Sequence, residues 1–123
     1  MRLRHRGLFA GLALLVASAS GGAYVAHAQH HSSTAHKTKI VHVKMVHGAF
    51  AFSPKSITIT VGTKVMWKDS TGVAHTVTAT KGAHFNKQLA ASGKTSITFK
   101  KAGTISYICS IHPFMKGKIT VKK

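Results

Sequence analysis

The sequence is nearly devoid of acidic residues, because Asp69 is the only carboxylate side chain among 123 residues. This absence excludes every mechanism that needs two carboxylates, and with it the paired-carboxylate glycosidases and the aspartic proteases. It also excludes a carboxylate-rich cage for calcium or magnesium. A Ser-His-Asp triad would have to use Asp69 itself.

Cysteine is equally scarce, since Cys109 is the only one. A lone cysteine cannot form an internal disulfide. It is therefore a buried thiol, one half of an intermolecular bridge, or a metal ligand. Charged residues make up 15% of the chain and hydrophobic residues 44%, as in a folded domain. The length corresponds to one such domain. The 18 basic residues leave a formal net charge of +17.

The first 28 residues have the features of a secretory signal. Three arginines precede an apolar stretch from Leu8 to Ala19, and Ala26 and Ala28 fit the small-residue rule for cleavage. An uncleaved membrane anchor is the alternative, although serines and glycines weaken the apolar run. We therefore expect a cleaved signal peptide over residues 1–28 and a periplasmic or secreted protein. Membrane association is expected only if this segment stays uncleaved.

Residues 29–39 are polar, rich in histidine and without apolar periodicity, which indicates a flexible leader. His30, His31 and His36 leave open a second metal site, against the simpler interpretation as a polar linker. The domain proper is expected over residues 40–123.

Short segments with alternating apolar residues dominate this domain, and no strong helical period is present. We expect strands at residues 40–45, 56–61, 65–68, 74–80, 95–99, 104–109 and 117–121. Residues 85–91 are expected to form one irregular or helical turn. Short strands with glycine-bearing turns predict an all-β sandwich or barrel.

The surroundings of the lone cysteine favour the metal-ligand interpretation. Cys109, His112 and Met115 place a thiolate, an imidazole and a thioether at intervals of three residues in one short segment. His75, in a distant strand-like run, is the natural fourth ligand. Two imidazoles, a thiolate and a weak axial thioether describe a blue-copper site. Zinc is the alternative metal, but it does not favour a thioether, so Met115 shifts the choice toward copper.

These residues lie in a chain that resembles the small cupredoxins, the plastocyanin and amicyanin kind of blue-copper protein. The matching segments are residues 52–59, 62–67, 75–78 and 107–117. The short gap between His112 and Met115 is closest to amicyanin. The resemblance implies a Greek-key β-sandwich that holds one type 1 copper ion through His75, Cys109, His112 and Met115. The chain departs from the family at two positions where asparagine is common, Asp69 and Thr76.

The resemblance also implies the role of a one-electron carrier rather than an enzyme. Copper delivery or storage is the alternative, since the same ligands would serve it. The excess of lysine predicts a redox partner that is acidic at its docking surface. The lysines are dispersed and no nucleic-acid motif is present, so no nucleic-acid partner is expected. We expect a monomer.

Overall fold

The computed structural model describes residues 36–123. The predicted signal peptide, 1–28, and residues 29–35 of the predicted leader lie outside the described residues. Residues 36–123 contain no helix, and so none long and apolar enough to cross a membrane. They form the strands β1 Thr38–Val46, β2 Ala49–Ser53, β3 Ser56–Thr60, β4 Thr63–Asp69, β5 His75–Lys81, β6 Asn86–Leu89, β7 Lys94–Phe99, β8 Gly103–Ile108 and β9 Lys116–Lys122.

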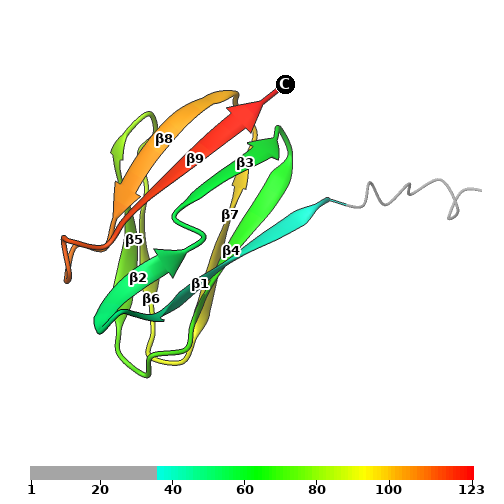
Figure 1. The fold of residues 1–123 in the computed structure, drawn as a ribbon. Helices are drawn as coiled ribbons and strands as arrows, with labels where there is room; N and C mark the ends of the chain where they lie inside the picture. The colour runs from blue at the N-terminus through cyan, green and yellow to red at the C-terminus, as the bar shows by residue number, and fades with distance from the viewer. Residues whose placement is uncertain (1–35) are drawn as a thin grey trace, which may run out of the picture. The chain divides into compact units, whose positions relative to one another are not determined.

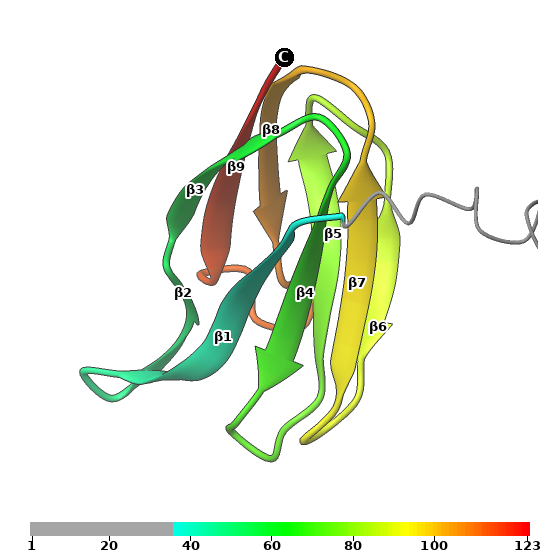
Figure 2. The same cartoon turned by 90° about the vertical axis from the view of Figure 1, so that its right-hand side faces the viewer.

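Two sheets face each other as a sandwich (Figures 1 and 2). One sheet has the strand order β2-β1-β4-β7 and the other β3-β9-β8-β5-β6. The pairs β1–β4 and β3–β9 are parallel, and the other pairs are antiparallel. The chain passes from the first sheet to the second at Pro54 and Lys55, between β2 and β3. The all-β Greek-key sandwich predicted from the sequence is confirmed.

The core lies between the sheets and follows the alternation in the sequence. In β3, Ile57 and Ile59 are buried while the neighbouring threonine side chains face the solvent. Trp67, Phe99 and Tyr107 are also buried. Burying a large apolar side chain contributes about 1.5–3 kcal/mol, so this alternation determines which face of each strand turns inward.

Two strands differ from the sequence expectation. The expected irregular or helical turn over residues 85–91 is wrong, because residues 86–89 form β6 and pair with β5. β6 is a polar edge strand, and its pairing comes from its neighbour rather than from its own pattern. The sequence also gives no indication of β2, which pairs with β1 across a tight turn at His47 and Gly48. Both turn residues have positive φ, which suits a two-residue hairpin.

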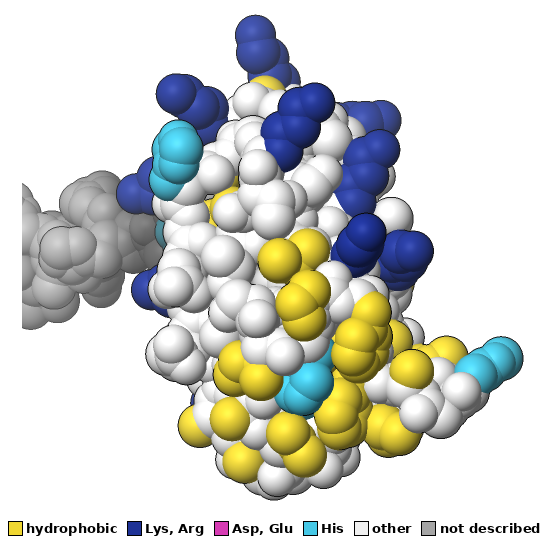
Figure 3. All heavy atoms as spheres, turned by 90° about the vertical axis from the view of Figure 1, so that its left-hand side faces the viewer, with side chains coloured by type: hydrophobic (Ala, Val, Ile, Leu, Met, Phe, Trp, Pro, Cys, Tyr) yellow, Lys and Arg dark blue, Asp and Glu magenta, His cyan; other side chains and the backbone are white. Residues whose placement is uncertain are grey.

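The two ends of the sandwich differ sharply in charge. One end carries the turns and loops 47–48, 70–74, 90–93 and 109–115, and none of these contains a charged residue. The opposite end has lysines at the start of β1, at the end of β5, in the β7–β8 connection and at the C-terminus. These are Lys37, Lys39, Lys81, Lys100, Lys101, Lys122 and Lys123. Figure 3 shows this segregation, with lysine side chains over the upper part of one face and hydrophobic side chains below.

Candidate metal centre

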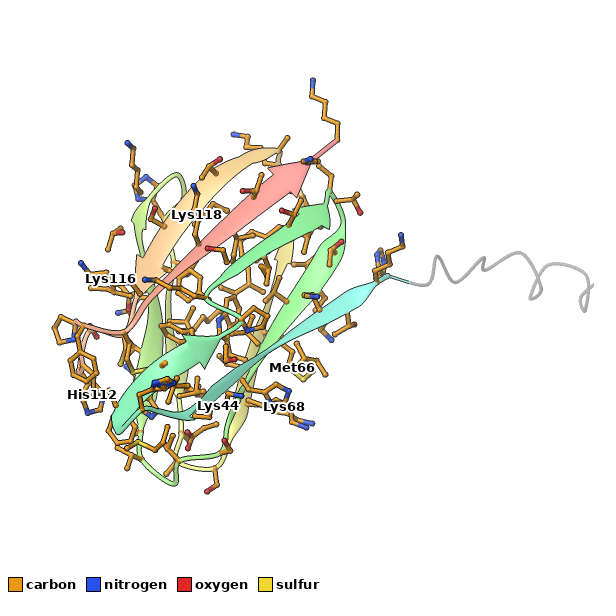
Figure 4. All side chains as sticks on the ribbon, in the orientation of Figure 1. Lys44, Met66, Lys68, His112, Lys116 and Lys118 are labelled. Carbon is orange, nitrogen blue, oxygen red and sulfur yellow. The ribbon has the colours of Figure 1, made fainter. Side chains whose placement is uncertain are left out.

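The uncharged end of the sandwich brings together three of the four predicted ligands. His75 is the first residue of β5, Cys109 directly follows β8, and His112 lies in the loop that leads to β9 (Figure 4). β5 and β8 are antiparallel neighbours, so the start of one strand meets the end of the other. This topology brings His75 close to a segment more than thirty residues away, as expected for a ligand that joins two strands.

Their donor atoms are spaced as a single metal ion requires. The atoms lie within 4.8 Å of one another, and Cys109 Sγ is 3.9 Å from His75 Nδ1 and 3.8 Å from His112 Nδ1. Bonds of about 2.0 Å to nitrogen and about 2.3 Å to sulfur, at about 120°, give a sulfur–nitrogen separation of about 3.7 Å. The three residues therefore fit one ion, and a set of two histidines and one cysteine is that of type 1 copper.

Met115, the predicted axial ligand, closes the same loop. Its side chain is buried. Its backbone N–H donates to the carbonyl of His112 at 2.8 Å, and its carbonyl accepts from the N–H of Cys109 at 3.1 Å. The bond between Cys109 and Met115 joins both ends of the segment 109–115, and the bond between Met115 and His112 closes its second half. Together they hold Cys109, His112 and Met115 in one compact turn.

Thr76 braces the cysteine through its backbone and its side chain. The Thr76 N–H donates to Cys109 Sγ at 3.3 Å, as expected for a residue that tunes the thiolate. Its hydroxyl accepts from the N–H of Ser110 at 2.7 Å and lies 2.9 Å from the Ser110 hydroxyl. A hydroxyl pair therefore links β5 to the ligand loop, and no amide side chain is needed.

His75 turns its second ring nitrogen toward polar groups. Nε2 lies 2.9 Å from the hydroxyl of Thr71 and 3.6 Å from Asp69 Oδ1. Burial lowers the pKa of His75; the charge of Asp69 opposes this effect and that of His112 adds to it. Burial also works against the charged form of Asp69, but hydrogen bonds from Thr71 and the Ser92 amide outweigh it, so the pKa of Asp69 is lowered.

Phe50, from the unexpected strand β2, packs against both imidazoles. Its ring centroid is 5.1 Å from that of His75 and 5.0 Å from that of His112, with the rings edge-on. This contact restricts the orientation of both rings, so Phe50 belongs to the site. No signal in the sequence marks it, because only the sheet topology brings β2 beside the ligand loop. Asp69 carries a signal, since it is the single acid of the chain.

The other described histidines lie outside this group. Among residues 36–123, His75, Cys109 and His112 are the one set of three or more His, Cys, Asp or Glu residues close enough to share an ion. His36, His42, His47 and His84 are all exposed. His30 and His31, for which the sequence leaves a second metal site open, lie outside the described residues.

Comparison with known proteins agrees with the fold and the donor set. The family described as "Copper binding proteins, plastocyanin/azurin family" matches residues 39–122. Amicyanin-alpha of Methylorubrum extorquens is 33% identical over 76 residues, which are 58% of this chain and 64% of that protein. Plastocyanin of Rumex obtusifolius is 33% identical over 90 residues, 61% of this chain and 91% of that protein. The chain thus spans less than two thirds of the amicyanin it matches.

Solved structures show the same likeness. The purple cupredoxin of Nitrosopumilus maritimus superposes with a TM-score of 0.62 at 28% identity, covering 68% of this chain and 99% of that one. Amicyanin of Paracoccus versutus superposes with a TM-score of 0.60 at 28% identity, covering 69% and 81%. The family match extends over nearly all described residues and includes the histidine–cysteine cluster. The chain therefore belongs to the copper-binding plastocyanin/azurin family, and its cofactor is copper.

Proposed function

We propose that this chain is a one-electron carrier that holds a single type 1 copper ion through His75, Cys109, His112 and Met115. The observation that carries the proposal is the convergence of two imidazole nitrogens and one thiolate sulfur, within 4.8 Å, at one end of a stiff sandwich. A bound copper ion supplies a one-electron couple between Cu(I) and Cu(II).

The surrounding residues hold the ligand atoms in place whichever oxidation state is present. Cys109 receives the Thr76 N–H, and the hydroxyl pair of Thr76 and Ser110 ties β5 to the ligand loop. Phe50 limits rotation of both imidazoles. Met115 would supply a thioether whose weak bond to the ion tunes the potential. A frame held at this many points needs little rearrangement on electron transfer.

The route for electrons is the partly exposed edge of His112. Large apolar side chains surround this end of the molecule, with Phe114 60%, Ile111 52% and Val73 39% exposed. Figure 3 shows hydrophobic side chains gathered around a histidine at the lower end of this face. A small apolar patch suits a transient redox encounter, which buries little surface.

The charge segregation bears on the partner. The loops around His112 carry no charged residue, so the centre of the contact is apolar. Lys55 and Lys116 line a groove that also includes Phe114. Figure 4 shows Lys116 beside the loop of His112. We therefore place the expected acidic groups of the partner at the rim, opposite these two lysines. The lysines of the far end contribute little there, because salt screens charges beyond about 8 Å.

An absorption spectrum of the copper-loaded protein tests the ligand assignment. We expect an intense visible thiolate-to-copper band that Cys109→Ala abolishes while the fold is retained. His84→Ala is the matched control and should leave the band unchanged, because His84 is exposed and outside the cluster. Met115→Leu should keep the band and raise the potential. A colourless Cu(II) complex of the wild-type chain would refute the proposal.

Kinetics then separate electron transfer from copper delivery or storage. A reversible potential with rapid electron self-exchange supports the carrier. Rapid loss of Cu(I) to a competing chelator, with slow self-exchange, supports delivery.

Export and cleavage after Ala28 complete the proposal, supported by the three arginines, the apolar stretch and the small-residue site. Expression of the full chain followed by mass analysis tests it, and a mature protein that begins at Gln29 is the expected result. A monomer is expected, which sedimentation checks.

A further inference from the structure

The single acid of the chain is buried beside the metal centre. The side chain of Asp69 is fully inaccessible to solvent. Among the described residues, His75 is the one basic side chain within 4 Å of the carboxylate, with 3.6 Å between Asp69 Oδ1 and His75 Nε2. A buried carboxylate costs several kcal/mol unless hydrogen bonds compensate for its lost hydration. In a chain that otherwise has no acids, this placement calls for an explanation.

Four donors hold this carboxylate in its charged form. Oδ1 accepts from the Thr71 N–H at 2.9 Å and from the Thr71 hydroxyl at 2.6 Å. Oδ2 accepts from the Gly72 N–H at 3.1 Å and from the Ser92 N–H at 2.7 Å. Asp69 therefore connects the β4–β5 loop to the β6–β7 loop, and both loops lie at the metal end of the sandwich.

The hydrogen bonds around Thr71 determine which nitrogen of His75 carries the proton. A hydroxyl has one hydrogen to donate, and the hydrogen of Thr71 goes to the acceptor-only carboxylate of Asp69. The Thr71 oxygen must therefore accept at its 2.9 Å contact with His75 Nε2, as it does from the Val73 N–H at 3.2 Å. His75 consequently carries its proton on Nε2, which leaves the lone pair of Nδ1 directed toward Cys109 Sγ.

We propose that Asp69 is a positioning residue that acts through Thr71 to fix the tautomer of His75 and to place a negative charge beside the copper. The relay runs from carboxylate to hydroxyl to imidazole, in the manner of the carboxylate–histidine pairs that support metal ligands elsewhere. Its effect on copper rests on the proposed assignment of His75 as a ligand. The relay itself belongs to the metal-free chain as well.

The charge has a definite direction of effect. The oxidised centre carries one more positive charge than the reduced centre, so a fixed anion nearby stabilises the oxidised form more. Little water screens this interaction, because both Asp69 and His75 are buried. Asparagine has nearly the same size as aspartate but carries no charge. This chain therefore has a lower reduction potential than its own Asp69→Asn variant.

Asp69→Asn tests the charge. Loss of a supporting partner of this kind changes metal affinity about 10-fold to 100-fold. Because the charge of Asp69 acts mainly on the oxidised form, its removal should weaken Cu(II) binding more than Cu(I) binding. We therefore expect the ratio of reduced to oxidised protein at a fixed solution potential to rise about tenfold, which is about 59 mV for one electron. Lys68→Gln is the control, because this substitution also removes one charge, from the residue next to Asp69. The side chain of Lys68 is exposed to solvent, so its loss should shift the ratio far less.

The tautomer is tested in the metal-free protein, by the nitrogen chemical shifts of the His75 ring. The wild-type chain should show a protonated Nε2. Thr71→Ser retains the hydroxyl and should preserve this signature, whereas Thr71→Val removes the hydroxyl and should mix the two tautomers. Should Asp69→Asn fail to fold, the Thr71 pair still decides the matter.

The outcomes separate this inference from the proposed function. An unchanged potential in Asp69→Asn, or a wild-type His75 protonated on Nδ1, overturns the inference. A His75→Ala variant that keeps the visible copper band overturns the ligand assignment instead, and the tautomer of the metal-free chain still tests the relay.

Discussion

Gly117 leaves no room for an added side-chain atom between β8 and β9. It lies in β9 directly opposite Tyr107 of β8, and the ring of Tyr107 lies against it. A Cβ at Gly117 would lie well within 3.0 Å of Cζ and the hydroxyl oxygen of Tyr107. Separations below 3.0 Å do not occur, so Gly117→Ala has to displace the ring.

Tyr107 has nowhere to move without loss. It is buried, packs edge-on against Phe52 and Trp67 at ring-centroid distances of 4.8 Å and 5.6 Å, and accepts a hydrogen bond from Trp67 Nε1 at 3.2 Å. Burial raises the pKa of Tyr107 to about 12, so the phenol is neutral. Overpacking costs about 1–3 kcal/mol, and the weakened hydrogen bond about 1 kcal/mol more. Alanine regains about 0.5–1 kcal/mol of glycine's entropic penalty in a strand.

The expected net loss is about 2 kcal/mol of the free energy of unfolding. For a domain of this size that corresponds to about 8–16 °C in Tm. Urea and thermal denaturation of the metal-free protein measure it, with fluorescence of Trp67, the only tryptophan, as the probe. Gly62→Ala serves as a comparison for backbone strain alone, because nothing lies within 4 Å of the added Cβ and only the positive φ opposes the change.

Tyr107 can be tested as the cause by a double-mutant cycle. In a Tyr107→Leu background the added methyl group meets a smaller, more flexible side chain. Gly117→Ala should therefore cost at least about 1 kcal/mol less of the free energy of unfolding. Residues in contact usually show coupling energies of about 0.5–3 kcal/mol. The reasoning is refuted if the cost of Gly117→Ala is the same in both backgrounds.

Two further predictions concern charge. A lowered Asp69 pKa contributes stability that is present above its ordinary value of 3.8 and is lost as the pH falls through the lower folded value. The free energy difference between metal-free wild type and Asp69→Asn should therefore shrink from about pH 5 to about pH 2, and urea titrations that show no change would contradict this. Lys68 and Lys94 are direct neighbours across β4 and β7, so Lys94→Glu should stabilise the fold by about 0.5 kcal/mol at low salt. Lys94→Gln should give a smaller gain, and a gain that persists in 1 M salt would show that charge is not the cause.

Local patterns determined much of this protein. The alternation of Ile57 and Ile59 with threonines specified a half-buried strand, because successive side chains of a strand point to opposite faces. The spacing of Cys109, His112 and Met115 needs only one loop, so the sequence alone could indicate a soft-metal site there. The near-absence of carboxylates excluded whole classes of enzyme before any fold was considered.

Other features depend on which strands become neighbours, and local sequence does not carry that information. Phe50 contacts the imidazoles because β2 pairs with β1 at the metal end, and β6 is a strand because β5 offers it an edge. Seven lysines from separate parts of the chain come together at the opposite end only after folding. Asp69 could be singled out as the one acid, but its place beside His75 required the β4–β5 loop to fold back on itself. Each of these contacts joins residues through tertiary pairing, where the free energy of burial and hydrogen bonding decides the arrangement.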